Sequence, residues 1–413
     1  MITIAVVGGG YAGLNTVKAL YKQLAGAEKN AVRLVLIDKH PYHFRKVMLF
    51  KEAVDGAVLH IPFAEILEPG IEFLQASLVA VDPLTRKIRY DTPAGTGVLM
   101  YDKLVLALGS SIVETPPELG GISLHSVENA RRVRQEMTAC LRRAKETADA
   151  AQRKKLLSVA VVGGGITGME TAAELSHWLR KEARLARLDP SLVSVTLINA
   201  AKRLLPGKPE KFRSVIERTL TDVGVRIVNG TKAVRHADGR VELDNGQSLD
   251  AAVCVWTLGL RANPLIRTLG LPTDDKGRLV VDAQYRLHGD RNVYAIGDNA
   301  KIVDPDTGAE DEMTCKEAVA QATRLARVIK ADLEGKSAPR HKSYIPLYCV
   351  GLGPERGVFW FRPWGKQLDV IFTGKLGLKL RHATWNIPSF YTGKVVKRLQ
   401  AVDRRTERLT NVP

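Results

Sequence analysis

The sequence predicts an α/β fold with two Rossmann-like domains, one inserted into the other, and a small C-terminal region. Two observations predict this fold. A glycine-rich run that follows a short apolar, β-branched stretch occurs twice, and each time a helical pattern comes after it. In addition, 413 residues are enough for two or three domains with a large buried core.

The first glycine-rich run extends from Gly8 to Gly13, between an apolar stretch at 2–7 and a helical pattern at 14–24. Its first glycine permits a tight turn, its second lets the backbone approach a pyrophosphate, and its third lets the helix pack closely on the strand. The next apolar stretch ends at Asp38, whose carboxylate can accept hydrogen bonds from a ribose diol. This site therefore fits a ribose without a 2′-phosphate, as in the adenosine of FAD or NAD.

The second run extends from Gly163 to Gly168 and has the same strand-like and helical surroundings. The strand that follows it ends in Asn199, an amide instead of an acid. An amide can still bond a ribose hydroxyl, but the penalty that a negative charge imposes on a 2′-phosphate is absent, and Lys202 is near enough in sequence to favour one. NADPH is therefore not excluded at this site.

Three further strand-like stretches complete the pattern: 101–110, 253–264 and 292–298. In their order and spacing, together with the two glycine runs, they resemble the two-dinucleotide flavoprotein superfamily of pyridine-nucleotide oxidoreductases. Within it the chain is most similar to the type II NADH dehydrogenase family, over about residues 1–375. The resemblance implies a discontinuous FAD-binding domain at 1–120 and 277–345, an inserted NAD(P)H-binding domain at 121–276, and a C-terminal region at 346–413.

The same resemblance implies a reaction and its residues. Hydride would pass from NAD(P)H to FAD, and two electrons would then pass to a quinone-like acceptor. The two cofactors must stack, so the two domains must face each other. The implied FAD residues are Gly8, Gly10, Tyr11, Ala12, Gly13, Asp38, Lys39, Leu78, Ala107, Gly109 and Asp298. The implied NAD(P)H residues are Gly163, Gly165, Ile166, Thr167, Gly168, Asn199 and Gly259, with Glu170 reaching toward the nicotinamide as a catalytic residue.

One helix departs from the family pattern. The family's quinone-site helix opens with Thr-Ala-Gln and carries another Gln one turn on. In the matching stretch, 313–321, Lys316 replaces the first Gln, Ala320 replaces the second, and Gln321 comes one place late. A lysine beside the flavin pyrimidine ring would stabilise negative charge on reduced flavin, but it would not reproduce an amide contact with a quinone. We therefore predict Lys316 as a second catalytic residue, and the acceptor stays open.

The cysteines leave two alternative functions open. Between Gly13 and Leu108 there is no cysteine, whereas disulfide reductases of the superfamily carry a redox pair there, so that chemistry is disfavoured. Cys315 and Cys349 are candidates for the pair of a sulfide- or thiol-linked quinone reductase, as opposed to small buried thiols without chemistry. The other alternative is a slow-turnover, redox-sensing flavoprotein.

The charge balance fits nucleic acid, anionic lipid or acidic ligands as a partner, or a merely basic surface. Lys and Arg total 61 against 44 Asp and Glu, a net charge of +17. No nucleic-acid recognition module is visible, so we predict no nucleic-acid partner. Residues 366–413 interleave basic and aromatic residues, which suits a helix on an anionic membrane; a packed helix or a homodimer contact is the alternative. The residues expected at the lipid are Lys375, Lys379, Arg381, Lys394, Lys397 and Arg398 around Trp385, Phe390 and Tyr391.

Targeting signals are absent from the sequence. The N-terminal residues lack a basic region and a cleavage site, and no apolar run approaches the roughly 20 residues that a membrane-spanning helix needs. Four cysteines are too few for a disulfide scaffold and suit a reducing compartment. We therefore predict a cytoplasmic protein, peripheral on the inner face of the cell membrane, with no metal site.

Overall fold

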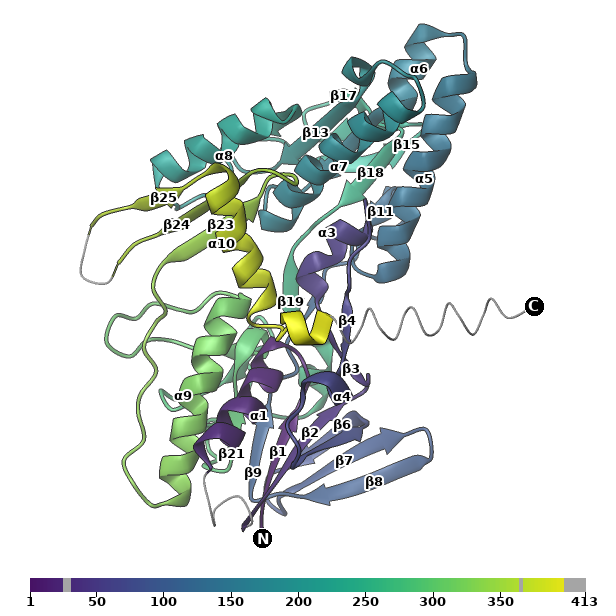
Figure 1. The fold of residues 1–413 in the computed structure, drawn as a ribbon. Helices are drawn as coiled ribbons and strands as arrows, with labels where there is room; N and C mark the ends of the chain where they lie inside the picture. Colours follow the sequence, from purple (N-terminus) through teal and green to yellow (C-terminus); the bar gives the residue numbers. More distant parts are fainter. Residues whose placement is uncertain (25–30, 364–366, 397–413) are drawn as a thin grey trace.

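The computed structural model describes residues 1–24, 31–363 and 367–396. Two five-stranded parallel sheets, each with helices packed on it, form the two halves of the molecule (Figure 1). The first has the strand order β21-β9-β1-β2-β5, and the second the order β11-β18-β12-β13-β14. The predicted fold of two Rossmann-like units is therefore confirmed.

The first sheet is assembled from two distant parts of the chain. Its strands are β1 (Ile2–Val7), β2 (Val32–Asp38), β5 (Ile71–Gln75), β9 (Lys103–Leu106) and β21 (Val293–Ala295). β21 pairs in parallel with β9, so the chain returns to this sheet only after it has built the second. Two helices, α1 (Tyr11–Gln23) and α9 (Cys315–Leu333), pack against each other on it. An antiparallel sheet of β6 (Ser77–Asp82), β7 (Lys87–Thr92) and β8 (Gly95–Met100) adjoins it.

The second sheet lies wholly within the inserted part. Its strands are β11 (Ile122–Ser123), β12 (Ser158–Val162), β13 (Ser194–Asn199), β14 (Val225–Asn229) and β18 (Val253–Trp256). All five residues of β12 are buried, as expected of a central strand in a parallel sheet covered on both faces. The helices of this half are α5 (Val127–Glu146), α6 (Ala150–Leu156), α7 (Ile166–Leu185) and α8 (Glu210–Asp222).

Both nucleotide-facing helices begin three residues earlier than the helical pattern predicts. The amide of Leu14 donates to the carbonyl oxygen of Gly10, and that of Met169 to Gly165, each at 3.0 Å. The glycine turn therefore passes directly into the helix, and its last residues already belong to the first helical turn.

Shorter elements connect and extend the two halves. β10 (Ser110–Ile112) and β19 (Leu260–Ala262) form an antiparallel ribbon where the chain passes between them. The remaining short elements are β3 (Tyr42–Phe44), α3 (Leu49–Glu52), β4 (His60–Pro62), α4 (Phe63–Ile66), β15 (Ala233–Ala237), β16 (Arg240–Leu243), β17 (Ser248–Asp250), β20 (Leu279–Val280) and β22 (Ala300–Lys301), with 3₁₀ turns at Lys46–Met48, Pro117–Leu119, Pro190–Leu192, Pro264–Thr268 and Gly297–Asn299.

The C-terminal region packs into the body of the molecule. An antiparallel sheet of β23 (Leu347–Gly351), β24 (Gly357–Phe361) and β25 (Val370–Phe372) carries α10 (Gly374–Asn386), drawn in yellow between the two halves in Figure 1. Beyond the helix, the carbonyl of Pro388 accepts a hydrogen bond from Asn15 of α1, at 3.0 Å. This region therefore connects both halves.

Two side chains expected at the lipid are buried. Trp385 is 2% exposed and Arg381 8% exposed, because both face the body of the protein from α10, so their predicted contact with lipid is wrong. Lys397 and Arg398 lie outside the described residues. Within the described ranges, no helix has the length and apolarity needed to cross a membrane.

Candidate functional site

The two glycine turns have the same backbone geometry. Gly8 has φ +105° and Gly163 has φ +119°, values that side-chain-bearing residues rarely adopt. A Cβ atom added to Gly13 would lie 1.8 Å from the carbonyl oxygen of Gly8, and one added to Gly168 would lie 1.8 Å from that of Gly163. The first and third positions of both turns therefore accept only glycine.

The second glycine of each turn borders open space. A Cβ atom added to Gly10 or Gly165 would have no protein atom within 4 Å. Both residues are exposed, and each precedes the first turn of its helix, α1 or α7. Each turn therefore leaves a cradle beside the positive end of a helix dipole, which fits a pyrophosphate.

A pocket extends from the first turn along the ends of the first sheet. Of the predicted FAD residues, only Gly13 and Leu78 are not among those that line it: Gly13 supports the turn from behind, and Leu78 is buried in β6. The residues that line the pocket are Gly8, Gly9, Gly10, Tyr11, Ala12, Asp38, Lys39, His40, Tyr42, Phe44, Lys46, Val47, Ala107, Leu108, Gly109, Ser110, Leu260, Gly297, Asp298, Met313, Cys315 and Ala318.

Backbone amides hold Asp38 at the end of β2. One carboxylate oxygen accepts from the amide of Gly9 at 2.6 Å, and the other from that of His40 at 2.9 Å. A carboxylate oxygen has more than one lone pair, so Asp38 can still accept from a ribose hydroxyl while these bonds orient it. The position agrees with the predicted ribose role.

Asp298 lies in a polar cluster at the other end of this pocket. Its Oδ2 accepts from the hydroxyl of Ser110 at 2.5 Å and lies 3.5 Å from the ammonium of Lys46, which also donates to the carbonyl of Ser110 at 3.2 Å. The sequence analysis missed both partners. Ser110 directly follows Gly109 and was within reach of the motif, but nothing near Lys46 in the sequence signals its role.

An amide pair occupies the end of β13 at the second turn. Nδ2 of Asn199 donates to Oδ1 of Asn229 at 2.8 Å and to the carbonyl of Ala201 at 2.9 Å. No acid takes part in these bonds, so the site is neutral at this point. Nearby, the guanidinium of Arg203 pairs with Glu210 at 2.7 Å and with Glu217 at 2.6 Å.

Other predicted residues of the second site surround its turn. Ile166 and Thr167 open α7, and Thr167 is exposed. Gly259, with φ +93°, lies between β18 and β19, and its carbonyl accepts from the amide of Val113 at 3.0 Å. These placements leave the predicted contacts with NAD(P)H open to experiment.

The C-terminal helix holds Glu170. This carboxylate is 1% exposed; its Oε1 accepts from the amide of Gly351 at 2.7 Å and from Nε of Arg381 at 2.8 Å, and its Oε2 from Nη2 of Arg381 at 3.0 Å. Although burial opposes a charged guanidinium, Glu170 raises the pKa of Arg381 above its usual value. Arg381 lies 211 residues away, so no local pattern could have revealed this pair.

Lys316 does not line the first pocket. Its ammonium donates to the carbonyl of Leu347 and lies 4.1 Å from the ring centroid of Tyr348, and burial lowers its pKa. Lys316 and Glu317 instead line a separate cavity of about 440 Å³ between α9 and β23–β24. The residues that face the first pocket from α9 are Cys315 and Ala318. The arrangement therefore gives no support for a lysine beside the flavin.

The two candidate cysteines approach one residue of α10. Sγ of Cys349 lies 3.3 Å from the hydroxyl of Thr384, and Sγ of Cys315 lies 4.0 Å from its carbonyl oxygen. Arg381 donates to Sγ of Cys349 at 3.4 Å. Both cysteines are free thiols, and burial raises the pKa of Cys315.

Comparison with known proteins gives a consistent set of relatives. Residues 2–322 match the family model described as pyridine nucleotide-disulphide oxidoreductase. A demethylphylloquinone reductase of Synechocystis sp. is 30% identical over 347 residues, which are 81% of this chain and 80% of that protein. A type II NADH:quinone oxidoreductase of Staphylococcus aureus is 28% identical over 90% of this chain and 91% of its own length.

Solved structures agree with the fold. NDH2 from Plasmodium falciparum in complex with NADH is similar with a TM-score of 0.78 at 16% identity, over 96% of this chain and 98% of that one. The sulfide:quinone oxidoreductase of Aquifex aeolicus has a TM-score of 0.74 at 17% identity, over 94% and 90%. At these identities the likeness concerns the fold.

Proposed function

The chain belongs to the pyridine nucleotide-disulphide oxidoreductase family, and from that premise we propose that it is an FAD-dependent NAD(P)H oxidoreductase that passes electrons to a quinone-like acceptor. The observation that carries the proposal is the duplicated turn. Gly10 and Gly165 both leave open space beside a helix N-terminus, so the chain offers two cradles for two dinucleotides.

The first cradle suits FAD and the second NAD(P)H. FAD, when bound, supplies the ability to accept a hydride and release its two electrons to the acceptor. In this proposal Asp38 orients the adenosine ribose, and the open face of Gly10 receives the pyrophosphate. Lys46, Ser110 and Asp298 form a charged, hydrogen-bonded cluster that holds the opposite end of the cofactor. At the second site the open face of Gly165 receives the pyrophosphate of NAD(P)H, and Asn199 orients its ribose.

The quinone-like acceptor is supported by the relatives. A demethylphylloquinone reductase and type II NADH:quinone oxidoreductases both align with most of this chain. The residues that would contact a quinone differ here, because Lys316 points into the cavity beside Tyr348. The proposal is therefore specific about the class of acceptor and leaves its headgroup open.

Absorbance and anaerobic titration test the proposal. We expect purified protein to carry a flavin spectrum that NADH or NADPH bleaches and that a soluble quinone restores. Steady-state NADH oxidation with that quinone separates rapid turnover from the redox-sensing alternative. Protein that neither contains FAD nor takes it up would sink the proposal.

A thiol-linked quinone reductase is the second candidate. It is favoured by the meeting of Cys315 and Cys349 at Thr384, with Arg381 donating to Cys349. If this candidate is right, Cys315→Ser and Cys349→Ser will each abolish quinone reduction driven by sulfide and leave reduction driven by NADH intact. Equal sulfide-driven rates in wild type and variants would exclude it.

We also propose that the outer face of α10 contacts anionic membrane. Lys375 and Lys379 are exposed, and Leu376 and Ile387 are 51% and 71% exposed. The aromatic residues expected to insert are otherwise engaged: the ring of Phe390 lies 4.1 Å from the ammonium of Lys18, and that of Tyr391 4.4 Å from the Arg45 guanidinium.

The membrane proposal is tested by co-sedimentation with anionic vesicles. Charge reversal of both lysines should weaken binding at low salt, since each contributes on the order of 1 kcal/mol near such a surface. Reversal of exposed Lys154, on α6, is the matched control. Wild type that stays in the supernatant at low salt would contradict the proposal, and light scattering would then test whether this face is a homodimer contact.

A further inference from the structure

A buried amide connects the turn that carries Asp298 to a polar cluster on its far side. Gln321 of α9 is 2% exposed. Its Oε1 accepts from the amide of Gly297 at 2.8 Å, and its Nε2 donates to Oδ2 of Asp311 at 2.8 Å. Gly297 is the residue before Asp298 and lines the same pocket. One side chain thus bridges the cofactor pocket and the interior.

The turn at Gly297 has little freedom of its own. Gly297 has φ +77°, and a Cβ atom added there would lie 2.8 Å from Cβ of Ala12, in the first turn of α1. A shift of this turn would therefore displace both Asp298 and the start of the helix that faces the first cradle. The position of the Gly297 amide matters for both.

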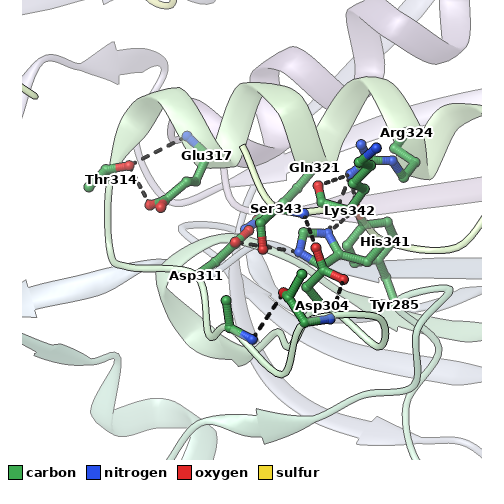
Figure 2. Close-up of polar contacts among 12 residues, drawn as sticks. Tyr285, Asp304, Asp311, Thr314, Glu317, Gln321, Arg324, His341, Lys342 and Ser343 are labelled. Carbon is green, nitrogen blue, oxygen red and sulfur yellow. Dashed lines mark hydrogen bonds and ion pairs between the residues drawn. The ribbon is translucent and has the colours of Figure 1, made fainter. Parts of the chain in front are cut away.

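The cluster behind Gln321 orients its amide. Figure 2 shows Asp311 between Gln321 and His341; the distance from Oδ1 of Asp311 to Nε2 of His341 is 3.4 Å. Nδ1 of His341 lies 2.9 Å from the hydroxyl of Tyr285, which also accepts from Arg324 at 3.1 Å.

Asp311 accepts a hydrogen bond from Gln321 at 2.8 Å, and the ring of His341 lies on its other side. An ionised carboxylate only accepts, so Asp311 requires the NH₂ group of Gln321 and directs the amide oxygen to the Gly297 N–H. A chain of bonds in a buried site is mutually reinforcing, and each unpaired member is costly.

From this arrangement we propose that Gln321 is a positioning residue for the bound flavin: anchored by Asp311, it holds the Gly297–Asp298 turn against α1. The inference rests on the proposed function and adds to it a residue that does not line the pocket. It also accounts for the displaced glutamine of α9, which supports the cofactor turn from inside the fold.

Two substitutions test the proposal by reconstitution of apoprotein with FAD. Gln321→Leu leaves the Gly297 N–H and Asp311 without their partner, and we expect FAD to bind about tenfold to a hundredfold more weakly, at pH 6 and pH 8 alike. Gln321→Glu places a carboxyl beside Asp311, and repulsion between two carboxylates favours a proton on one of them at the lower pH. When the introduced carboxyl is protonated, it can donate to Asp311 and accept from the Gly297 amide. The affinity of Gln321→Glu for FAD should therefore approach that of wild type at pH 6 and fall below it at pH 8.

The FAD affinity of Gln321→Glu at pH 6 and pH 8 distinguishes a positioning role for residue 321 from a role in packing alone. The groups that face this site are Asp311, His341 and Tyr285 from three loop segments and Glu317 and Arg324 from α9; all are present in wild type, which is measured at both pH values. Thr323→Ala, an exposed position two residues along the same helix, should bind FAD as wild type does. Unchanged FAD affinity in Gln321→Leu, or an equal loss at both pH values in Gln321→Glu, would overturn the proposal.

Failure of the proposed function and failure of the role of Gln321 give different results in these FAD-binding measurements. Wild-type apoprotein that does not bind FAD would contradict the function, whereas wild type that binds FAD with unaffected variants contradicts only the role of Gln321. If Gln321→Leu does not fold, as judged by its unfolding midpoint without FAD, the pH dependence of Gln321→Glu still decides.

Discussion

The two glycine turns share a backbone and differ in what surrounds it. In both, the first and third glycines are closed off by the chain itself and the second borders open space. At the strand ends, however, Asp38 is a carboxylate held by two backbone amides, while Asn199 is an amide paired with Asn229. The two turns therefore share their glycine geometry, and the charge of the strand-end side chain is where they differ.

The two sites also differ in their dependence on the C-terminal region. Beside the second turn, Glu170 is neutralised by Arg381 of α10, a residue beyond the 2–322 family match. The cluster beside the first turn, Lys46, Ser110 and Asp298, comes from within that match. The C-terminal helix therefore supplies a charged partner to a residue beside the second turn.

Filling either cradle should have the largest effect. In Gly10→Val the added Cβ atom has no protein atom within 4 Å, so we expect the fold to be kept while the pyrophosphate is blocked. We expect colourless protein with an unfolding midpoint close to that of wild-type apoprotein. Flavin absorbance and circular dichroism check both parts, and retained FAD would contradict the assignment of the first cradle.

The matching change in the second cradle should leave the colour and remove the reaction. Gly165→Val also meets open space, so FAD content should be that of wild type. Flavin reduction by NADH should fall at least a hundredfold, whereas dithionite should still bleach the flavin. If Gly165→Val also loses its FAD, the assignment of FAD to the first turn and of NAD(P)H to the second is wrong.

Breaking the Glu170–Arg381 pair should cost the next largest amount. Arg381→Met leaves a buried carboxylate without its partner, which typically costs about 3–5 kcal/mol. Urea unfolding measures this, and Arg356→Met, which removes an exposed partner of Asp222, should cost about 1 kcal/mol or less. Partial recovery in the double variant Glu170→Gln/Arg381→Met is expected, since the uncompensated charge is then gone. If Arg381→Met and Arg356→Met lower the free energy of unfolding equally, this account is contradicted.

The same pair changes how the tail should be studied. Deleting residues 374–413 removes Arg381 and Trp385 together with the exposed lysines, so such a truncation confuses membrane contact with folding. Surface substitutions on α10 avoid this problem.

The smallest expected effect concerns the choice of nicotinamide cofactor. Asn199→Asp would add a negative charge where a 2′-phosphate would lie, worth about 1–2 kcal/mol or roughly tenfold in the ratio of kcat/KM for NADH over NADPH. Rotation of the Asn229 amide would supply a donor to the new carboxylate. Asn245→Asp, in an exposed turn, is the matched control. An unchanged ratio would show that Asn199 does not face the ribose.

Much of the fold and of the first site was predictable because its signals are local. The glycine turns and the strand-end Asp38 are each encoded within a few residues of chain, and most of the predicted FAD residues line one pocket. The helix starts were placed too late, since the periodic pattern begins only after the glycines, whereas the helical hydrogen bonds begin at Gly10 and Gly165.

The predicted lipid contact of Trp385 and Arg381 is wrong because both side chains are buried. The predicted catalytic role of Lys316 stays a prediction, and its position beside another cavity gives it no support. The rotation of α9, set by its contact with α1, turns Cys315 and Ala318 toward the pocket. Lys316 instead contacts Leu347, and Gln321 contacts Gly297. The basic and aromatic pattern of α10 is compatible with a lipid surface and with a buried face alike; Arg381 faces inward because Glu170 offers it a buried partner.

By itself the sequence determined the duplicated turn, the acid and the amide at the two strand ends, and so the two-domain fold. A φ above +100° or a contact too close for a Cβ atom admits only glycine, so these backbone requirements are visible in the sequence as glycines. The tertiary structure alone decided the partners of Glu170, of Asp298 and of Gln321. These partners lie 211, 252 and 24 residues away, and a buried polar group is satisfied by whichever group the fold brings within reach.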